Sequence, residues 1–362
     1  MFGIFKKQKK QDWNAEIGVS GKTFTVTAGD NLLKSALGSG VQWPHDCRVG
    51  SCGTCKCKLK SGQIKELSDF SYVLSQEDLQ AGMILACQSE LQSDVQIEVN
   101  LLEDSEQSLN ISSHKGLIHS MNALTHDIVE LVIKADEDIP RNALAGQYAE
   151  ISVSNIDQPR SYSFAKSPTK ENDREVSFFV RRVPDGEFTE WLFADDRVGE
   201  SVDITGPYGS FYLRPGQSPI VCVAGGSGMA PIKALLEHAR DNNCRREVLY
   251  LFGARSQKDL YCLDTMEQLK SNWKGKFEFI PVLSEEPEDS GWEGARGFVT
   301  DHLKQTYIDT NKVNMAKSQG YLCGPPPMID AAIEIFTAAG MDKDDVHFDK
   351  FLDASSMPGG RN

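Results

Sequence analysis

The chain has 362 residues, 40% of them hydrophobic and 25% charged, which is the composition of a globular protein long enough for two or three domains. Its formal net charge of −14 disfavours a nucleic-acid partner, because such partners attract basic surfaces. The nine cysteines form no evident disulfide framework, which favours a reducing compartment, and no apolar run is long enough to span a membrane.

The first ten residues place a short apolar run, Met1-Phe-Gly-Ile-Phe5, ahead of four lysines. A signal peptide has the opposite order, with positive charge first and a longer apolar stretch after it. The segment is therefore either a solvated tail, which we favour, or a weak anchor on an anionic bilayer. We expect a cytoplasmic protein that could lie at the inner membrane through this segment.

Residues 1–103 are predicted to form a first domain around a group of cysteines. Strand-like runs cover 16–26 and 96–99, and a short helical pattern covers 32–37. The charged, serine-rich stretch 104–113 that follows is predicted to be a linker.

Four cysteines of this domain are predicted metal ligands: Cys47, Cys52, Cys55 and Cys87. The spacing of the first three, C-x4-C-x2-C, is that of a plant-type [2Fe–2S] loop with a distant fourth thiolate. Gly50 and Gly53 suit such a loop, because glycine lets the backbone wrap closely with positive φ. We therefore predict a [2Fe–2S] cluster, which makes the protein an electron carrier.

A structural zinc site is the alternative for these cysteines. Zinc ribbons supply two C-x2-C pairs, whereas here Cys52 and Cys55 form one and Cys87 stands alone. The neighbouring Cys57 falls outside the pattern and is expected to be a packed thiol. The three-cysteine spacing favours the iron–sulfur centre.

Residues 114–214 are predicted to form a small antiparallel β-barrel. Proline and glycine separate its strand-like runs, which lie at 128–133, 148–153, 176–183 and 202–204. The tetrapeptide Arg160-Ser-Tyr-Ser163 places Arg160 and Tyr162 on one face of a strand, and Ser161 and Ser163 on the other. A cation, an aromatic ring and hydroxyls in this order suit a ligand that has a phosphate and a flat ring.

Residues 215–351 alternate buried strands with amphipathic helices, which predicts a parallel sheet covered by helices on both faces. The predicted strands are 219–224, 248–252, 277–282 and 320–323, and the predicted helices are 230–239, 263–269, 299–304 and 328–338. The tail 352–362 is rich in Gly, Pro and Ser and is expected to be disordered.

The loop Gly225-Gly-Ser-Gly-Met-Ala-Pro231 is a candidate for dinucleotide binding, because glycines at a strand-to-helix turn admit a pyrophosphate that the helix N-terminus attracts. It is not the G-x-G-x-x-G fingerprint, since a proline replaces the last glycine, and no Gly-Lys-Ser/Thr of a P-loop follows. A tight turn without a ligand is the alternative. The predicted site residues are Gly225, Gly226, Ser227, Gly228 and Pro231.

A second loop, Cys323-Gly-Pro-Pro-Pro-Met328, follows another predicted strand. Rigid prolines and an unhindered glycine beyond a strand's carboxyl end line the ligand crevice of such sheets. Cys323, Gly324 and Pro325 are therefore candidate cofactor contacts. Cys323 could instead be a core thiol, although its place favours a nicotinamide neighbour.

Together these three motifs resemble those of the ferredoxin–NADP⁺ reductase superfamily, and the cysteine module before them resembles the reductase components of bacterial mono- and dioxygenases. The chain is similar in particular to xylene monooxygenase electron-transfer components over nearly its whole length, for example through residues 44–56, 252–255 and 321–328. The resemblance implies a β-grasp [2Fe–2S] ferredoxin domain, a flavin-binding barrel and a nucleotide-binding α/β domain.

The resemblance also implies roles for residues of the barrel. Arg160 would bind the flavin pyrophosphate, Tyr162 would stack on the isoalloxazine and Ser163 would lie near its N5 atom. Thr189, in the loop that begins at Gly186, would contact the pyrophosphate.

FAD is implied rather than FMN, because members with the ferredoxin module first typically carry FAD. Tyr148 would help to wall the flavin, and Phe351, which closes the motif Phe348-Asp-Lys-Phe351, would cover its face. The catalytic residues implied are Ser163, Cys323 and Phe351.

NADH is favoured over NADPH as the electron donor. Selective binding of a 2′-phosphate calls for clustered basic residues beyond the second strand of the nucleotide domain. The stretch that begins with Arg255, Arg255-Ser-Gln-Lys-Asp259, offers two basic residues diluted by an acid.

The implied sequence is hydride transfer from NADH to FAD, followed by one-electron steps through the cluster to an oxygenase component. The acceptor would belong to a hydrocarbon monooxygenase of the xylene type, which could be membrane-embedded, or to a Rieske dioxygenase. A carrier or redox sensor without turnover, and a stand-alone flavin or ferric reductase, are the alternatives. We expect a monomer with no nucleic-acid partner.

Overall fold

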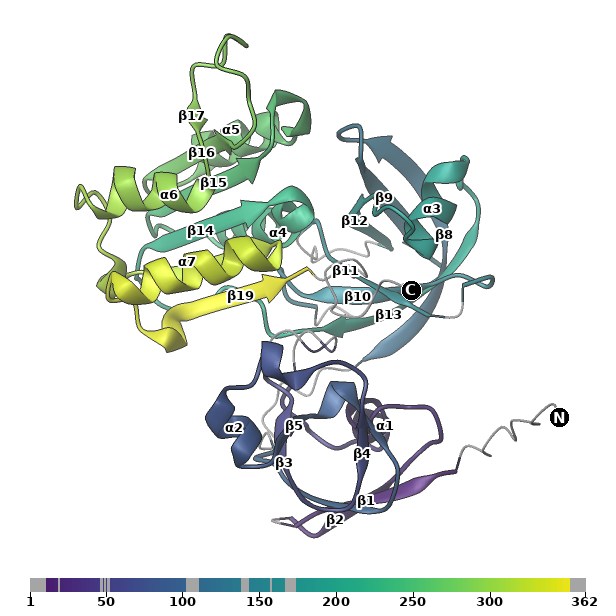
Figure 1. Cartoon of the computed structure of the whole chain (residues 1–362). Helices are drawn as coiled ribbons and strands as arrows, with labels where there is room; N and C mark the ends of the chain where they lie inside the picture. The colour runs from purple at the N-terminus through teal and green to yellow at the C-terminus, as the bar shows by residue number, and fades with distance from the viewer. Residues whose placement is uncertain are drawn as a thin grey trace, which may run out of the picture. The chain divides into compact units, whose positions relative to one another are not determined.

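The computed structural model describes residues 11–18, 20–45, 48, 50, 53–101, 111–137, 143–156, 158–166 and 174–351. These residues form two compact units, one ending at residue 101 and one beginning at residue 111 (Figure 1). The segment 1–10, most of the predicted linker and the tail 352–362 lie outside the described residues. Among the described helices, none has the length and hydropathy that a membrane span requires.

The first unit has the predicted β-grasp arrangement, in which a helix packs on a mixed sheet. The strand order is β2-β1-β7-β3-β5, and β1 runs parallel to β7 while the other pairs are antiparallel. Strands β4 and β6 form a separate small sheet. The elements are β1 (Trp13–Ile17), β2 (Lys22–Val26), α1 (Leu32–Gly38), β3 (Lys56–Ser61), β4 (Ile64–Glu66), η1 (Phe70–Tyr72), α2 (Gln76–Gln80), β5 (Met83–Leu85), η2 (Ala86–Gln88), β6 (Ser89–Leu91) and β7 (Val95–Glu98).

The run predicted as one strand over 16–26 is two antiparallel strands, β1 and β2. Gly21 has a φ of +64° in the turn between them, and its N–H donates to the carbonyl of Ile17. The alternation of buried and exposed residues continues on both sides of the turn. Periodicity alone therefore does not reveal the reversal.

The second unit begins with the predicted antiparallel barrel. Its strand order is β11-β10-β13-β8-β9-β12, and a bridge between Phe164 and Phe178 joins the two edge strands, so the sheet is nearly closed. The elements are β8 (Ser112–Ala123), β9 (Ile128–Ala135), β10 (Tyr148–Ser152), β11 (Arg160–Ser163), β12 (Glu175–Arg181), α3 (Glu187–Ala194) and β13 (Ser201–Tyr208).

The same unit continues into a parallel sheet of order β17-β16-β15-β14-β18-β19. Helices α4 and α5 cover one face, and α6 and α7 cover the other (Figure 1). Every residue of the central strand β14 is buried, as expected for a sheet covered on both faces. The elements are β14 (Ile220–Gly225), η3 (Gly226–Gly228), α4 (Met229–Asp241), β15 (Val248–Ala254), η4 (Gln257–Asp259), α5 (Leu263–Asn272), β16 (Phe277–Leu283), β17 (Ala295–Arg296), α6 (Val299–Leu303), the π-helical η5 (Lys304–Ile308), η6 (Met315–Lys317), β18 (Gln319–Gly324), α7 (Pro326–Ala338), η7 (Lys343–Asp345) and β19 (Val346–Lys350).

Strands β3 to β6, β8, β17 and β19 were not predicted. Strand β8 begins at Ser112, inside the predicted linker, and its sequence is mostly polar because Gly116 and Ile118 are its fully buried residues. The edge strand β19 has no fully buried residue and therefore carries no hydrophobic run. Both strands are held by backbone pairing to neighbours that lie far away in the sequence.

The barrel and the parallel sheet share one hydrophobic core. Phe179 and Phe211 of the barrel are buried together with Met229, Tyr261 and Tyr321 of the sheet region. Because apolar surface in both modules would be exposed if they separated, the two modules form one body.

Glycines let the loops after β14 and β18 pack against each other. A Cβ at Gly228 would lie 2.2 Å from the carbonyl oxygen of Cys323, and a Cβ at Gly324 would lie 2.7 Å from the carbonyl oxygen of Gly225. Gly324 also has a φ of +135°. Both contacts are with backbone atoms, which cannot move aside without shifting a strand.

We predict that Gly228→Ala destabilises the second unit by about 1–3 kcal/mol, because the added methyl group forces β14 and β18 apart. Urea unfolding followed by circular dichroism measures the change. Gly38→Ala is the control, since a Cβ there meets nothing within 4 Å and the backbone is ordinary helix. Equal midpoints for the two variants would contradict the packing argument.

Candidate functional site

Two of the four predicted cluster ligands lie side by side in the first unit. The Sγ atoms of Cys55 and Cys87 are 3.3 Å apart, and both side chains are buried. Trp43 donates its indole N–H to the carbonyl of Cys55 and so fixes the end of the loop. Cys47 and Cys52 lie outside the described residues.

The loop around these thiols has the glycine geometry that the sequence predicts. Gly50 has a φ of +81° and Gly53 a φ of +74°. A Cβ at Gly50 would lie 2.6 Å from Gln88, and one at Gly53 would lie 3.2 Å from Val73. Paired, buried thiols near glycines of positive φ fit a [2Fe–2S] cluster held by thiolates.

Cys57 belongs to the core of the first unit, as expected. It lies on β3 and is 1% exposed. Burial, and to a lesser degree the neighbouring Cys55, raise the pKa of its thiol far above the ordinary value. Its place in the core and outside the ligand spacing make Cys57 a packing residue.

In the barrel, Arg160 and Tyr162 face helix α3, which confirms that they share one side of β11. The ring of Tyr162 lies 5.5 Å from that of Phe188, and a guanidinium nitrogen of Arg160 lies 3.4 Å from the carboxylate of Glu187. Gly186, the N-cap of α3, has no side chain to satisfy the first N–H groups of the helix. A guanidinium beside an uncapped helix N-terminus suits the pyrophosphate of a flavin dinucleotide.

The hydroxyl of Thr189 holds the backbone of the loop before α3 through hydrogen bonds. This oxygen accepts the N–H of Val183 at 3.1 Å and lies 3.0 Å from the carbonyl of Val183 and 3.1 Å from that of Gly186. A Cβ at Gly186 would lie 2.7 Å from the same oxygen. These bonds shape the loop, and the predicted contact between Thr189 and a pyrophosphate stays a prediction.

Tyr148 forms part of an aromatic wall in the barrel. Its ring centre lies 5.6 Å from that of Tyr208, and a Cβ at Gly209 would lie 3.0 Å from the ring. Tyr148 is also the cross-strand partner of Ser163. Ser161 is exposed on β11.

The predicted dinucleotide loop is a sharp turn from β14 into α4. Gly225 ends the strand, and Gly226, with a φ of +56°, begins the short helix that also contains Ser227. Pro231 lies in the first turn of α4, where a missing N–H costs nothing. A guanidinium nitrogen of Arg181, from barrel strand β12, lies 3.5 Å from the position of a Cβ at Gly226.

Residues from three elements meet beside this turn. Ser163 of β11 donates its hydroxyl to the carboxylate of Asp349 at 3.3 Å, and Asp349 pairs with Cys323 across β19 and β18. Burial, reinforced by the Asp349 carboxylate, raises the pKa of the Cys323 thiol well above the ordinary value. Cys323 is therefore a neutral thiol at neutral pH rather than a nucleophilic thiolate.

Asp349 is the residue of this group that sequence reasoning missed. The sequence assigned a role only to Phe351 of the motif Phe348-Asp-Lys-Phe351. Phe351 donates its N–H to the carbonyl of Gly324 at 2.9 Å and packs against the core shared by the two modules. The N-cap of α7 is Pro325, so Gly324, Pro325 and Phe351 lie together beyond the end of β18.

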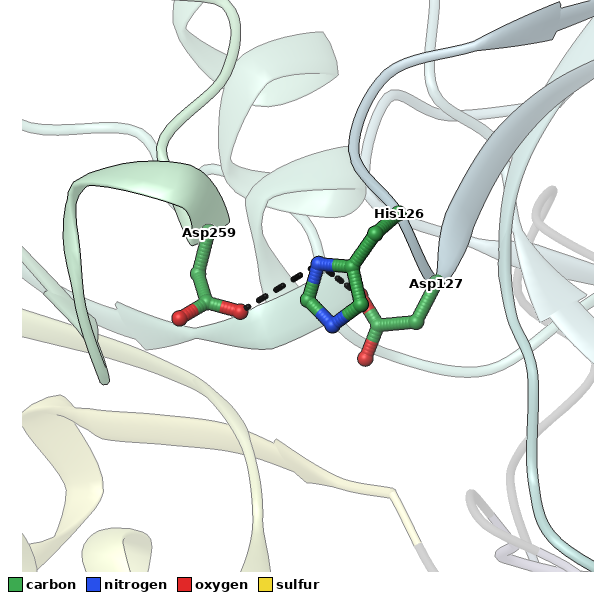
Figure 2. A group of neighbouring side chains, drawn as sticks. All are labelled: His126, Asp127 and Asp259. Atoms are coloured by element: carbon green, nitrogen blue, oxygen red, sulfur yellow. Dashed lines mark ion pairs between the residues drawn. The ribbon is translucent and has the colours of Figure 1, made fainter.

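Arg255 lies in a network of charges between the two modules. Asp127 of the β8–β9 turn accepts from Arg181 at 2.9 Å and lies 3.5 Å from Arg255, which also contacts Asp259 at 3.1 Å. Figure 2 shows the ring of His126 between the two carboxylates, 4.0 Å from Asp127 and 3.8 Å from Asp259.

The three residues drawn in Figure 2 are close enough to hold a metal ion, but their charges are already balanced. Burial alone would raise the pKa of Asp127, yet hydrogen bonds from Thr125 and Arg181 outweigh burial and hold this pKa below the ordinary value. Two guanidinium groups thus take the place that a cation would fill. We describe the group as an ion-pair network rather than a metal centre.

Comparisons with known proteins agree with this division of the chain. Residues 16–92 match a 2Fe-2S iron-sulfur cluster binding domain, residues 116–212 an oxidoreductase FAD-binding domain and residues 222–334 an oxidoreductase NAD-binding domain. The xylene/toluene monooxygenase electron transfer component of Pseudomonas putida is 43% identical over 331 residues, which cover 91% of each chain.

Other relatives extend the comparison to different oxygenases. The reductase component of propane 2-monooxygenase from Mycolicibacterium smegmatis is 33% identical and covers 90% of this chain and 93% of its own. The solved structure of a ferredoxin reductase in carbazole 1,9a-dioxygenase is 28% identical, with a TM-score of 0.76 over 94% of this chain and 99% of that one. The chain therefore belongs to the NAD(P)H-dependent reductase components of multicomponent oxygenases, which join an N-terminal [2Fe–2S] ferredoxin domain to FAD- and NAD-binding domains of the ferredoxin–NADP⁺ reductase type.

Proposed function

We propose that this chain carries electrons from NADH, through FAD and the [2Fe–2S] cluster, to the oxygenase of an aromatic hydrocarbon monooxygenase of the xylene type. The observation that carries the proposal is the similarity to the xylene/toluene monooxygenase component over 91% of the chain. The alternative, a carrier or redox sensor without turnover, is weaker, because the relatives are reductase components.

Individual roles follow from the site described above. Arg160 and the N-terminus of α3 hold the flavin pyrophosphate, Tyr162 and Tyr148 flank its ring, and Ser161, Gly186 and Thr189 shape the strand and loop around it. The turn from Gly225 to Gly228, with Pro231 behind it, receives the pyrophosphate of NADH. The flavin, when bound, converts two-electron chemistry into one-electron steps, which the cluster then relays.

Within this arrangement the protein orients the flavin and the nicotinamide. Ser163 donates a hydrogen bond to the carboxylate of Asp349, which would orient the Ser163 hydroxyl beside the flavin. Cys323 and Gly324 border the nicotinamide, and the Cys323 thiol stays neutral there. Phe351 moves aside when the nicotinamide binds.

The cluster ligands in the proposal are Cys47, Cys52, Cys55 and Cys87. Replacing Cys55 or Cys87 by Ser removes one ligand, so we predict loss of the cluster's visible absorbance and of electron transfer to a one-electron dye. Reduction of the flavin by NADH should persist, because it precedes the cluster.

Cys57→Ser is the matched control for these variants, since Cys57 lies on the adjacent strand but outside the ligand set. It should keep the absorbance and the dye reduction. A Cys57 variant that loses the cluster, or a Cys87 variant that keeps it, would contradict the assignment.

The preference for NADH is supported by the turn after β15. The carboxylate of Asp259 accepts the N–H and the hydroxyl of Ser256, both at 2.9 Å, and it also contacts Arg255. Glu286, from the loop after β16, accepts the N–H of Gln257 at 2.8 Å. The donors of Arg255, Ser256 and Gln257 are thus occupied by carboxylates, which repel a phosphate and accept a ribose hydroxyl, while Lys258 is exposed.

We predict that Asp259→Ser raises kcat/KM for NADPH by about ten- to hundred-fold, because it frees Arg255 and Ser256 and removes a like charge. Asp289→Ser removes an acid from the nearby exposed loop and serves as the control. Steady-state kinetics with both nucleotides measure the ratio. An unchanged ratio in the Asp259 variant would overturn this account of the preference.

The acceptor could be a membrane-embedded di-iron hydroxylase or, as an alternative that the carbazole dioxygenase reductase favours, a Rieske dioxygenase. We propose the former, with a cytoplasmic, monomeric reductase whose first ten residues are a solvated tail or, as the alternative, a weak anchor at the inner membrane. Four lysines after an apolar start suit an anionic bilayer surface.

We predict that membranes containing the hydroxylase stimulate NADH oxidation by the full chain. Deletion of residues 1–10 leaves this stimulation unchanged if the segment is a solvated tail and weakens it if the segment is an anchor. Oxidation with a soluble dye as acceptor should be unchanged by the deletion. Stimulation by a soluble Rieske oxygenase, and none by the membranes, would favour the alternative acceptor.

A further inference from the structure

Lys233 is a largely buried lysine that has no role in the proposed electron transfer. It lies on α4, one turn beyond the dinucleotide loop, and its side chain is 13% exposed. Its Nζ atom pairs with Glu237 at 2.8 Å on the same helix. Ion pairs between residues of one helix usually lie on the exposed surface. The burial of the Lys233 side chain therefore indicates a second contact.

The further contact of Lys233 crosses from the sheet to the barrel. Its Nζ donates to the carbonyl of Ala165 at 3.0 Å. Ala165 lies just beyond β11, two residues after Ser163, and its own N–H donates to Ser177 of β12 at 2.7 Å. The lysine therefore holds the end of the strand that presents Ser163 to the flavin.

An aromatic contact supports the same junction. The ammonium lies 6.0 Å from the ring centre of Phe179 in β12, and Tyr261 packs edge-on against the same ring at 5.5 Å. The hydroxyl of Tyr261 donates to the carbonyl of Gly226 at 2.8 Å. Lys233 and Tyr261, both from the sheet module, thus meet at Phe179 of the barrel.

We propose that Lys233 is a positioning residue that sets the separation between strand β11 and helix α4, and through it the distance between the flavin and the nicotinamide. This inference rests on the proposed function. In hydride transfer, NADH loses two electrons and a proton as one hydride and leaves as NAD⁺, while the bound flavin accepts that hydride. The rate of such a step depends steeply on a near-attack distance, which a displaced strand lengthens.

The test compares Lys233→Met and Lys233→Arg with the wild type by anaerobic stopped-flow absorbance of the flavin at saturating NADH. We expect the methionine variant to be reduced about ten- to hundred-fold more slowly, with a much smaller change in the KM for NADH. The arginine variant should recover most of the rate, because its guanidinium can still donate to the carbonyl of Ala165.

Lys270→Met is the matched control. Lys270 pairs with Glu267 on α5 at 3.7 Å, is 52% exposed and lies on a helix of the same module. It should leave the rate unchanged. The proposal would be overturned if Lys233→Met were reduced as fast as the wild type. It would also be overturned if the rate fell only by the factor by which the KM for NADH rose.

Hydrogen–deuterium exchange of the full chain without NADH gives a second readout. In Lys233→Met, peptides covering 160–166 and 229–241 should exchange faster than in Lys270→Met. If the wild type itself were not reduced by NADH, the proposed function would fail, while the exchange rates would still decide whether Lys233 couples the two elements. Unchanged exchange in both peptides would contradict the coupling.

Discussion

The hydrophobic core shared by the barrel and the parallel sheet is the constraint on which the site depends. Phe179 and Phe211 are buried from the barrel side and Tyr261 and Tyr321 from the sheet side. Burying one aromatic side chain of this size contributes about 1.5–3 kcal/mol, so the two modules resist separation. Ser163 and Cys323, which lie far apart in the sequence, can therefore be held near one point without a ligand to draw them together.

Polar contacts fix how the two modules align at this apolar interface. The hydroxyl of Ser163 reaches Asp349, the ammonium of Lys233 reaches the carbonyl of Ala165, and Arg181 and Arg255 share Asp127. A hydrophobic interface alone tolerates sliding, whereas directional hydrogen bonds and ion pairs do not. All of these contacts join the barrel to the sheet module, except the one between Arg181 and Asp127, which lies within the barrel.

Much of this organisation could be predicted because its signals are local. Three features each require particular residue types at fixed intervals: the spacing of Cys55 from the other cysteines, the glycine turn that ends at Pro231, and the alternating residues of β11. Most strands of the barrel and of the parallel sheet were predicted for the same reason, whereas the short strands β3 to β6 near the cysteines were not. The turn at Gly21 was missed because the alternation continues across it.

The parts that could not be predicted depend on contacts between distant segments. Strand β19 carries Asp349 but is an edge strand without a buried run, so its pattern is indistinguishable from a loop. The bond between Lys233 and Ala165 and the capture of Ser256 donors by Asp259 require the folded arrangement of loops. A lysine or an aspartate in the sequence gives no sign of such a partner.

The most direct test of the central claim is the order of reduction after anaerobic mixing with NADH, followed by flavin absorbance and by rapid-freeze electron paramagnetic resonance of the cluster. If the barrel and sheet form the entry point and the cluster the exit, flavin absorbance falls first and the cluster signal follows. In protein stripped of flavin, NADH should leave the cluster oxidised. A cluster signal that appears before the flavin change, or without flavin, would contradict the account.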